Sequence, residues 1–278
     1  VGAWSSGGNM NTAIQGVGSA INGTQTASLS FGGELGPGPT DDTESYDGSS
    51  WTAATEMSAK AALPGGAGTQ TAALRFGGNP TGTTANDHVE TFDGSSWTET
   101  AELNTARYGL KGAGTQTAAL GFGGFPAHKD ETESWNGSAW TELSDLNTGR
   151  TKLAGNGETN TAALGVGGET PSLTAAVESW NGTSWTEIAD INTARSSTGS
   201  SGSQTNGLIF GGDDPGASAL TESWDGTSWT EVADLGTARL SLGGSGTQSL
   251  ALGFAGVPVL SITEEWTQAV ALKTLAST

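Results

Sequence analysis

The sequence contains no cysteine, and only ten of its 278 residues are lysine or arginine. The lack of cysteine excludes disulfides, thiolate catalysis and cysteine-based metal sites. The ten basic residues face 29 acidic ones, which gives a formal net charge of −19. Nucleic-acid binding requires a basic surface that displaces counterions, so we expect no nucleic-acid partner. This charge balance is typical of an exterior protein that anionic membranes repel.

Long apolar runs and helical periodicity are also lacking. No stretch approaches the length of a membrane span, so we expect no membrane insertion. The chain begins Val1-Gly2-Ala3-Trp4 without Met or a signal peptide. We therefore expect a processed form or one segment of a longer protein. The 45 glycines recur at regular intervals, which indicates turns rather than disorder.

A sequence motif recurs about every 45 residues. Its clearest copy, from Val177 to Arg195, is V-E-S-W-N-G-T-S-W-T-E-I-A-D-I-N-T-A-R. Its second tryptophan falls at Trp51, Trp97, Trp140, Trp185 and Trp229. A Gly-Gly pair that ends an apolar run recurs at the same interval. A fixed period of this length predicts units that bury their apolar faces only by stacking on one another.

The unit that starts at Arg107 predicts four short antiparallel strands. We expect strands at Tyr108–Gly112, Thr117–Phe122, Thr132–Trp135 and Trp140–Leu143. Gly123-Gly124 ends the second strand, and Asn136-Gly137 is a hairpin signal between the third and the fourth. Four strands in a unit of this size indicate a propeller blade.

The two ends of the chain predict a closed ring rather than a solenoid. Trp4 precedes Asn11-Thr12 as Trp140 precedes Asn147-Thr148, so Trp4 belongs to a fourth strand that has no earlier strands of its own. Thr263–Trp266 matches a third strand, and no second tryptophan follows it. We predict that the N-terminal strand completes the last blade, which removes two exposed sheet edges.

These features resemble the kelch repeat: Gly-Gly after the second strand, an aromatic residue in the third and a tryptophan five residues later. The resemblance implies an all-β, six-bladed kelch-like propeller over residues 1–266. The expected parts are a closing strand at 1–10, blades at about 14–57, 58–103, 104–146, 147–191, 192–235 and 236–266 plus 1–10, and a tail at 267–278. The sequence and composition of the repeats also resemble those of kelch-like repeats in marine bacteriophage tail and capsid-associated proteins.

The repeated polar and aromatic residues are expected to be structural. The tryptophans, placed in inner strands, should pack blade against blade. A glutamate two residues before each third-strand aromatic shares its face of the strand and should need a partner. Arginines recur where strand one begins, whereas the first two blades have Ile14 and Ala61 there. We expect Glu-Arg or Glu-backbone contacts among Glu133, Glu178, Glu222, Arg107, Arg150, Arg195 and Arg239. The Gly-Thr-Gln-Thr turns are interpreted as hairpin connections rather than an amide ring.

The loops between the second and third strands differ from blade to blade, and recognition usually lies in such variable loops. The candidate ligand-binding residues in them are Asp41, Asp42, His88, His128, Lys129, Asp213 and Asp214. Their carboxylates suit Ca²⁺, but no EF-hand or similar calcium-loop spacing is present. We expect solvation there, and neither a metal site nor a cofactor.

We predict a non-enzymatic, virion-associated binding or structural module, in a phage tail fibre or appendage that contacts host surface glycan. The sequence contains no G-x-S-x-G, H-E-x-x-H or P-loop motif. The expected partners are other virion proteins or the glycan, with homo-oligomerisation within a fibre, and the expected location is virion or extracellular. A secreted bacterial lectin or adhesin and a glycan-processing enzyme remain the alternatives.

Overall fold

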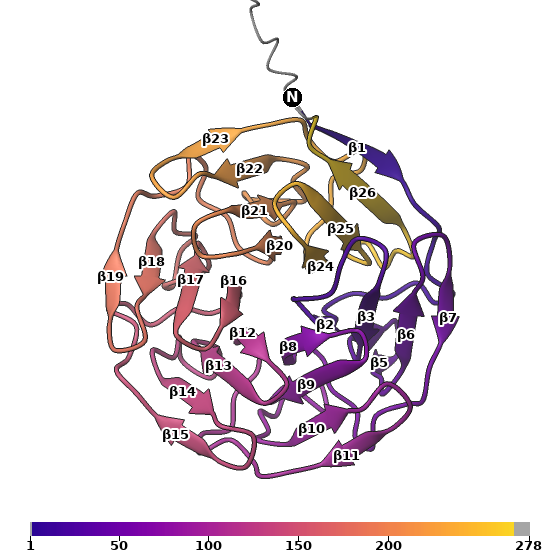
Figure 1. Ribbon diagram of the computed structural model, residues 1–278, viewed down its shortest axis with the longest axis vertical. Helices are drawn as coiled ribbons and strands as arrows, with labels where there is room; N and C mark the ends of the chain where they lie inside the picture. Colours follow the sequence, from indigo (N-terminus) through magenta and orange to yellow (C-terminus); the bar gives the residue numbers. More distant parts are fainter. Residues whose placement is uncertain (1, 270–278) are drawn as a thin grey trace, which may run out of the picture.

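A computed structural model describes residues 2–269 as a ring of six antiparallel four-stranded sheets (Figure 1). The protein is an all-β, six-bladed β-propeller, as predicted. No helix long and apolar enough to cross a membrane occurs in this part of the chain. Strand β26 ends at Thr267, one residue beyond the expected end of the ring, and residues 270–278 of the tail expected at 267–278 lie outside the described residues.

In each blade the first strand lies nearest the axis and the fourth lies at the circumference (Figure 1). The first blade contains β2 (Gly18–Ser19), β3 (Ser28–Phe31), β6 (Thr43–Tyr46) and β7 (Trp51–Ala53), with a small hairpin of β4 (Glu34–Leu35) and β5 (Gly38–Pro39). The second contains β8 (Gly65–Thr69), β9 (Ala72–Phe76), β10 (Val89–Phe92) and β11 (Trp97–Glu99). The third contains β12 (Lys111–Thr115), β13 (Ala118–Phe122), β14 (Thr132–Trp135) and β15 (Trp140–Glu142).

The remaining blades repeat this order. The fourth contains β16 (Ala154–Thr159), β17 (Ala162–Val166), β18 (Val177–Trp180) and β19 (Trp185–Glu187). The fifth contains β20 (Gly199–Gly202), β21 (Gly207–Phe210), β22 (Thr221–Trp224) and β23 (Trp229–Glu231). The sixth contains β24 (Gly243–Gly246), β25 (Leu250–Phe254), β26 (Thr263–Thr267) and the N-terminal strand β1 (Ala3–Ser6).

The predicted ring closure is confirmed, because β1 pairs with β26 and sets Trp4 opposite Trp266. The first strand of the third blade differs from the expectation. It starts at Lys111 rather than Tyr108, and Tyr108 forms a separate bridge with Phe125. Arg107 therefore precedes strand one by four residues, in the connection from the previous blade.

The core lies between blades, as expected of the tryptophans, but none of them lies in an inner strand. Four lie in third strands, and the other six lie in the outermost strands β1, β7, β11, β15, β19 and β23. Five of them pack on the second-strand phenylalanine of the preceding blade. The ring pairs, with centroid distances of 4.9–5.3 Å, are Trp4–Phe210, Trp51–Phe254, Trp97–Phe31, Trp140–Phe76 and Trp185–Phe122. Burial of large aromatic side chains dominates core energetics, so these pairs hold the ring together.

The turn glutamines also join blades, which neither interpretation of those turns anticipated. The Gln116 side-chain amide donates to the Phe92 carbonyl in the preceding blade at 2.6 Å. The same contact to a third-strand aromatic is made by Gln25, Gln70, Gln204 and Gln248. The Gln25 bond to Trp266 crosses the closure of the ring.

Candidate functional site

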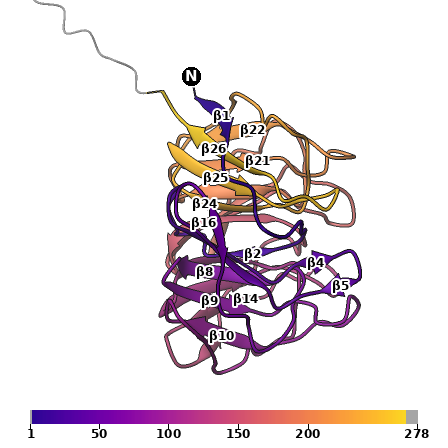
Figure 2. The same ribbon diagram turned by 90° about the vertical axis from the view of Figure 1, so that its right-hand side faces the viewer.

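One face of the ring carries the loops between second and third strands, and β4 and β5 project from it (Figure 2). Just before strand one, each blade adds an isolated antiparallel bridge to the first residue of such a loop. The six bridges are Gln15–Glu34, Ala62–Asn79, Tyr108–Phe125, Thr151–Glu169, Ser196–Asp213 and Leu240–Val257. The backbone is the same in every blade, whereas the side chains are not. We call these twelve residues the bridge ring.

The residue after the first member of each bridge takes part in a closed ring of backbone hydrogen bonds. Gly16 N donates to Ser241 O, Leu63 N to Gly16 O, Gly109 N to Leu63 O, Lys152 N to Gly109 O, Ser197 N to Lys152 O and Ser241 N to Ser197 O, at 2.8–3.1 Å. All six have left-handed backbones, with φ between 51° and 63°. Four are not glycine, and such residues hold this conformation only when the surrounding structure fixes it.

Inside this hydrogen-bonded ring the central channel is narrow. The cavity at its mouth measures about 20 Å³. Its lining consists of the six residues of the hydrogen-bonded ring together with Val17, Pro64, Leu110, Lys111, Thr198 and Leu242. That volume suits about one water molecule. At the opposite end, Asn22 reaches across from the first blade and its side chain donates to Gly114 O at 2.7 Å and to Glu158 O at 3.2 Å. The channel therefore has no room for a ligand larger than a water molecule.

A second cavity of the channel is lined mainly by residues of the first strands, such as Gly66, Gly112 and Gly199. Lys111 is the one charged residue among those that line it. Its burial lowers the pKa from 10.5 to about 8, with no carboxylate among the described residues close enough to oppose that effect. The channel therefore holds a cation that folding desolvates without pairing.

We expect Lys111→Met to stabilise the protein at pH 7. Because the folded-state pKa of Lys111 is lowered, the unfolded chain binds more protons between about pH 8 and pH 10.4, and wild-type stability rises through that window. The variant should gain about 1–2 kcal/mol, or about 3–6 °C in the unfolding midpoint, at pH 7, and the gain should fall through this window and vanish above about pH 10.4. Thermal melts at several pH values test this, with the exposed Lys60→Met as control. An equal, pH-independent effect of both substitutions would contradict it.

The bridge ring has one aromatic pair. The rings of Tyr108 and Phe125 stack with centroids 5.1 Å apart and an interplanar angle of 19°. His128 lies 5.8 Å from the Phe125 ring, and the Lys152 ammonium lies 6.0 Å from its centroid. Lys152 also pairs with Glu169 at 3.0 Å. All five side chains are half-buried, so an aromatic surface and two opposite charges face solvent together.

The repeated Glu-Arg contacts lie elsewhere, inside the blades, and all four are present. Arg107–Glu133, Arg150–Glu178, Arg195–Glu222 and Arg239–Glu264 are 2.6–2.9 Å apart and buried. Burial lowers the pKa of each arginine and the adjacent glutamate opposes that shift. In three blades an asparagine backbone amide also donates to the glutamate, as Asn104 does to Glu133 at 2.7 Å.

The second blade reaches the same charge balance by a different route. It has Ala61 where the last four blades have arginine, but Arg75 in β9 lies opposite Glu90 in the strand register and 3.9 Å from its carboxylate. Strand two has glycine at this position in the third, fourth and sixth blades, and an added Cβ at Gly165 would lie 3.4 Å from the Arg150 guanidinium. Arginine and the small residue have thus exchanged places.

Comparison with known proteins bears on the fold. The solved structure of YjhT superimposes with a TM-score of 0.74, covers 92% of this chain and 95% of its own, and shares 14% sequence identity. The likeness is one of fold. No protein-family model and no curated protein matches the sequence.

On this propeller the predicted ligand-binding residues lie in four blades and form no single cluster. Asp41 and Asp42 precede β6, His88 precedes β10, His128 and Lys129 precede β14, and Asp213 and Asp214 follow β21. Several have local partners: Lys129 pairs with Glu131, and Asp213 accepts a hydrogen bond from Gly216 N. Asp213 belongs to the bridge ring, and His128 lies beside Phe125 of that ring.

The sequence placed Phe125 and Glu169 in variable loops without singling them out as binding residues, and it did not indicate Tyr108 or Lys152 as surface residues. A signal existed, since aligning the repeats on Gly-Gly shows that the next position is Glu34, Asn79, Phe125, Glu169, Asp213 and Val257 in turn. Its partner across the bridge could not be found in this way, because Tyr108 was expected within strand one.

Proposed function

We propose that this kelch-like propeller is a non-enzymatic binding module that holds a host surface glycan across the bridge ring, within a phage tail fibre or appendage. The observation that carries the proposal is the stacked pair Tyr108–Phe125, half-buried on the variable face beside Lys152 and Glu169. Aromatic faces pack against the apolar faces of sugars, while flanking polar groups bind hydroxyls.

The burial of the repeated carboxylates and their pairing with arginine support binding rather than hydrolysis. Glycosidases need two available carboxyl groups on either side of the glycosidic bond. Glu133, Glu178 and Glu222 are instead buried and paired with arginine. The channel, with a cavity of about 20 Å³ at its mouth, is also too narrow to enclose a reacting sugar.

A glycan array probed with the fluorescently labelled chain, followed by titration of the best-bound glycan, tests the binding. We expect Phe125→Ala to lower the affinity for that glycan at least tenfold, a loss of about 1.4 kcal/mol of binding free energy. Val257→Ala is the matched control, because Val257 occupies the same bridge position in the sixth blade. Equal affinity of the Phe125 and Val257 variants, or no glycan bound, would contradict the proposal.

The virion setting is proposed from the resemblance of the repeats to those of phage tail proteins and from the net charge of −19. Neighbouring copies or other virion proteins would be its structural partners. Immunogold labelling of purified particles with an antibody to this chain should mark them. Absence from particles together with presence in bacterial culture medium would favour the secreted lectin or adhesin instead.

A further inference from the structure

The second blade differs from the others in the surroundings of its third-strand glutamate, Glu90. Glu90 is fully buried, and its Oε2 accepts a hydrogen bond from Ser58 N at 2.8 Å. Its Oε1 is buried without a hydrogen bond, because Arg75 lies 3.9 Å away and no arginine occupies position 61. In the other Arg-bearing blades the equivalent oxygen is held by arginine, as Arg107 holds Glu133 at 2.8 Å. Oε1 of Glu90 can therefore still accept a hydrogen bond.

His88 lies against that oxygen. Its Nε2 is 3.2 Å from Glu90 Oε1, and its Nδ1 is 3.3 Å from Oε1 of Glu99 in β11. A carboxylate this close to Nε2 favours the tautomer that carries its proton on Nε2, which leaves the Nδ1 lone pair available to a metal. A carboxylate beside the second ring nitrogen is a common partner of histidine ligands of metals.

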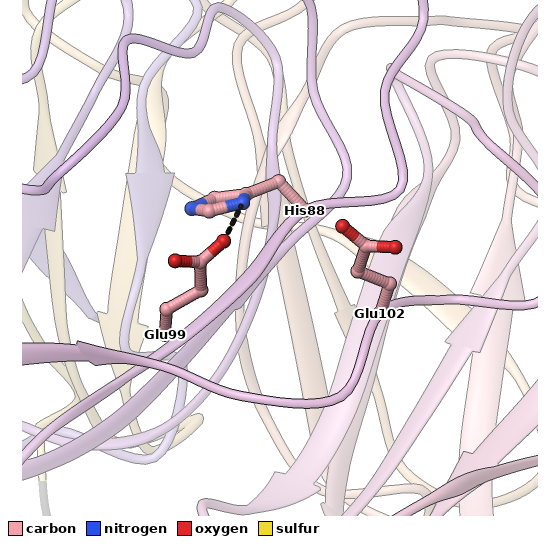
Figure 3. A group of neighbouring side chains, drawn as sticks. All are labelled: His88, Glu99 and Glu102. Carbon is pink, nitrogen blue, oxygen red and sulfur yellow. Dashed lines mark ion pairs between the residues drawn. The ribbon is translucent and has the colours of Figure 1, made fainter.

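Glu102, in the connection after β11, completes a cluster with His88 and Glu99. One ligand atom of each of the three lies within 4.8 Å of the others. Figure 3 shows the two glutamates on either side of His88. The glutamates are exposed, whereas the His88 side chain is 15% accessible, so solvent could reach the cluster from the circumference.

We propose that His88, Glu99 and Glu102 form a zinc-class divalent metal site, with His88 oriented by Glu90. Imidazole and carboxylate ligands around a small cation suit Zn²⁺, whereas Ca²⁺ takes oxygen ligands alone. The edge of a tetrahedron with bonds of about 2.05 Å is about 3.3 Å long, which matches the distance from Nδ1 to Glu99 Oε1. Water would take the fourth position.

The site is specific to this blade. The residues that directly precede the third strand in the other blades are Asp42, Glu131, Ala176, Leu220 and Ile262. The fourth-strand glutamate recurs at Glu142, Glu187 and Glu231, but without a histidine opposite. Bound metal would join the connection before β10 to β11 at the edge of the blade.

Calorimetric titration of the metal-free full chain with zinc sulfate tests the proposal. We expect one Zn²⁺ per chain, and at least a tenfold loss of affinity in each of His88→Gln, Glu99→Gln and Glu102→Gln. Glu187→Gln is the matched control, because it removes the same charge from the same strand position in another blade and should leave the affinity unchanged. Circular dichroism should show all four variants folded.

Replacing Zn²⁺ with Co²⁺ gives a second readout that depends on the ligands. Visible absorption with the intensity of a four-coordinate site should appear in wild type and in Glu187→Gln, and disappear in His88→Gln. Two results would overturn the proposal. One is no stoichiometric binding of either ion. The other is equal weakening in His88→Gln and Glu187→Gln, which would mean diffuse binding to an acidic surface.

Discussion

Replacing Arg195 with methionine should lower the midpoint of thermal unfolding by about 6–12 °C. The substitution leaves Glu222 buried without its cation, and breaking a buried ion pair costs about 3–5 kcal/mol. It also removes the Arg195 hydrogen bonds to Gly211 O and Leu220 O. Asn192 still donates its backbone and side-chain amides to Glu222 at 2.7 Å, so we take the low end, about 3 kcal/mol, at about 2–4 °C per kcal/mol.

The first blade supplies the matched control. Ile14 occupies the arginine position there, and Glu44 is held instead by Asn11 and Thr12, through the amide groups of both residues. Ile14→Met conserves volume at an apolar site, so it should shift the midpoint by less than about 3 °C. Scanning calorimetry of both variants decides the matter. Similar small shifts would mean that the amides alone satisfy the buried glutamate and that the arginines add little.

Repetition made the fold predictable from the sequence. Each blade position recurs several times, so the strand of Trp140 could be recognised again at Trp4, where only one strand of a blade is present. The register of Trp4 with Trp266 follows from that match. The Glu-Arg contacts could be predicted for the same reason, because a glutamate and an arginine recurred together in four blades.

The mouth of the channel could not be predicted, because it depends on contacts that link each blade to the next without a constant residue type. Glycine, leucine, lysine and serine all adopt the same left-handed backbone in the hydrogen-bonded ring. Geometry of the closed ring sets that conformation, and side-chain identity does not. The contact of Arg75 with Glu90 could not be predicted for a related reason. Arg75 lies in the second strand of its blade, whereas the other buried arginines precede the first strand, so only the strand register brings it opposite Glu90.

The same distinction separates scaffold from candidate site. Residues that recur are used in contacts within or between blades, including the turn glutamines, whose bonds reach the preceding blade. Residues that differ occupy constant backbone positions at the bridge ring, where Tyr108–Phe125 in one blade replaces Leu240–Val257 in another. A constant frame with changing side chains permits recognition to vary without loss of stability.

Removing the closing strand should destabilise the propeller more than any single substitution described above. A chain that begins at Asn9 loses β1, which leaves the edge of β26 unpaired and uncovers Trp266 and Phe210. Trp4 packs on these rings at 5.6 and 4.9 Å, and its indole donates to Thr221 at 3.1 Å. Loss of a packed tryptophan alone costs about 3–5 kcal/mol and the strand hydrogen bonds are lost as well, so we expect a midpoint more than about 12 °C lower. The bare edge should also cause concentration-dependent association.

A peptide of residues 2–8 distinguishes ring closure from a general effect of truncation. Added in excess to the shortened chain, it should pair with β26, raise the unfolding midpoint and suppress association, because a ligand that binds only the folded state stabilises it by mass action. The same peptide with Trp4→Ala keeps the backbone hydrogen bonds of β1 but lacks the indole, so it should rescue poorly. Equal rescue by both peptides would assign closure to strand pairing alone. An unchanged midpoint in the shortened chain would mean that the other inter-blade contacts, such as Gln25 to Trp266, are enough to keep the ring closed.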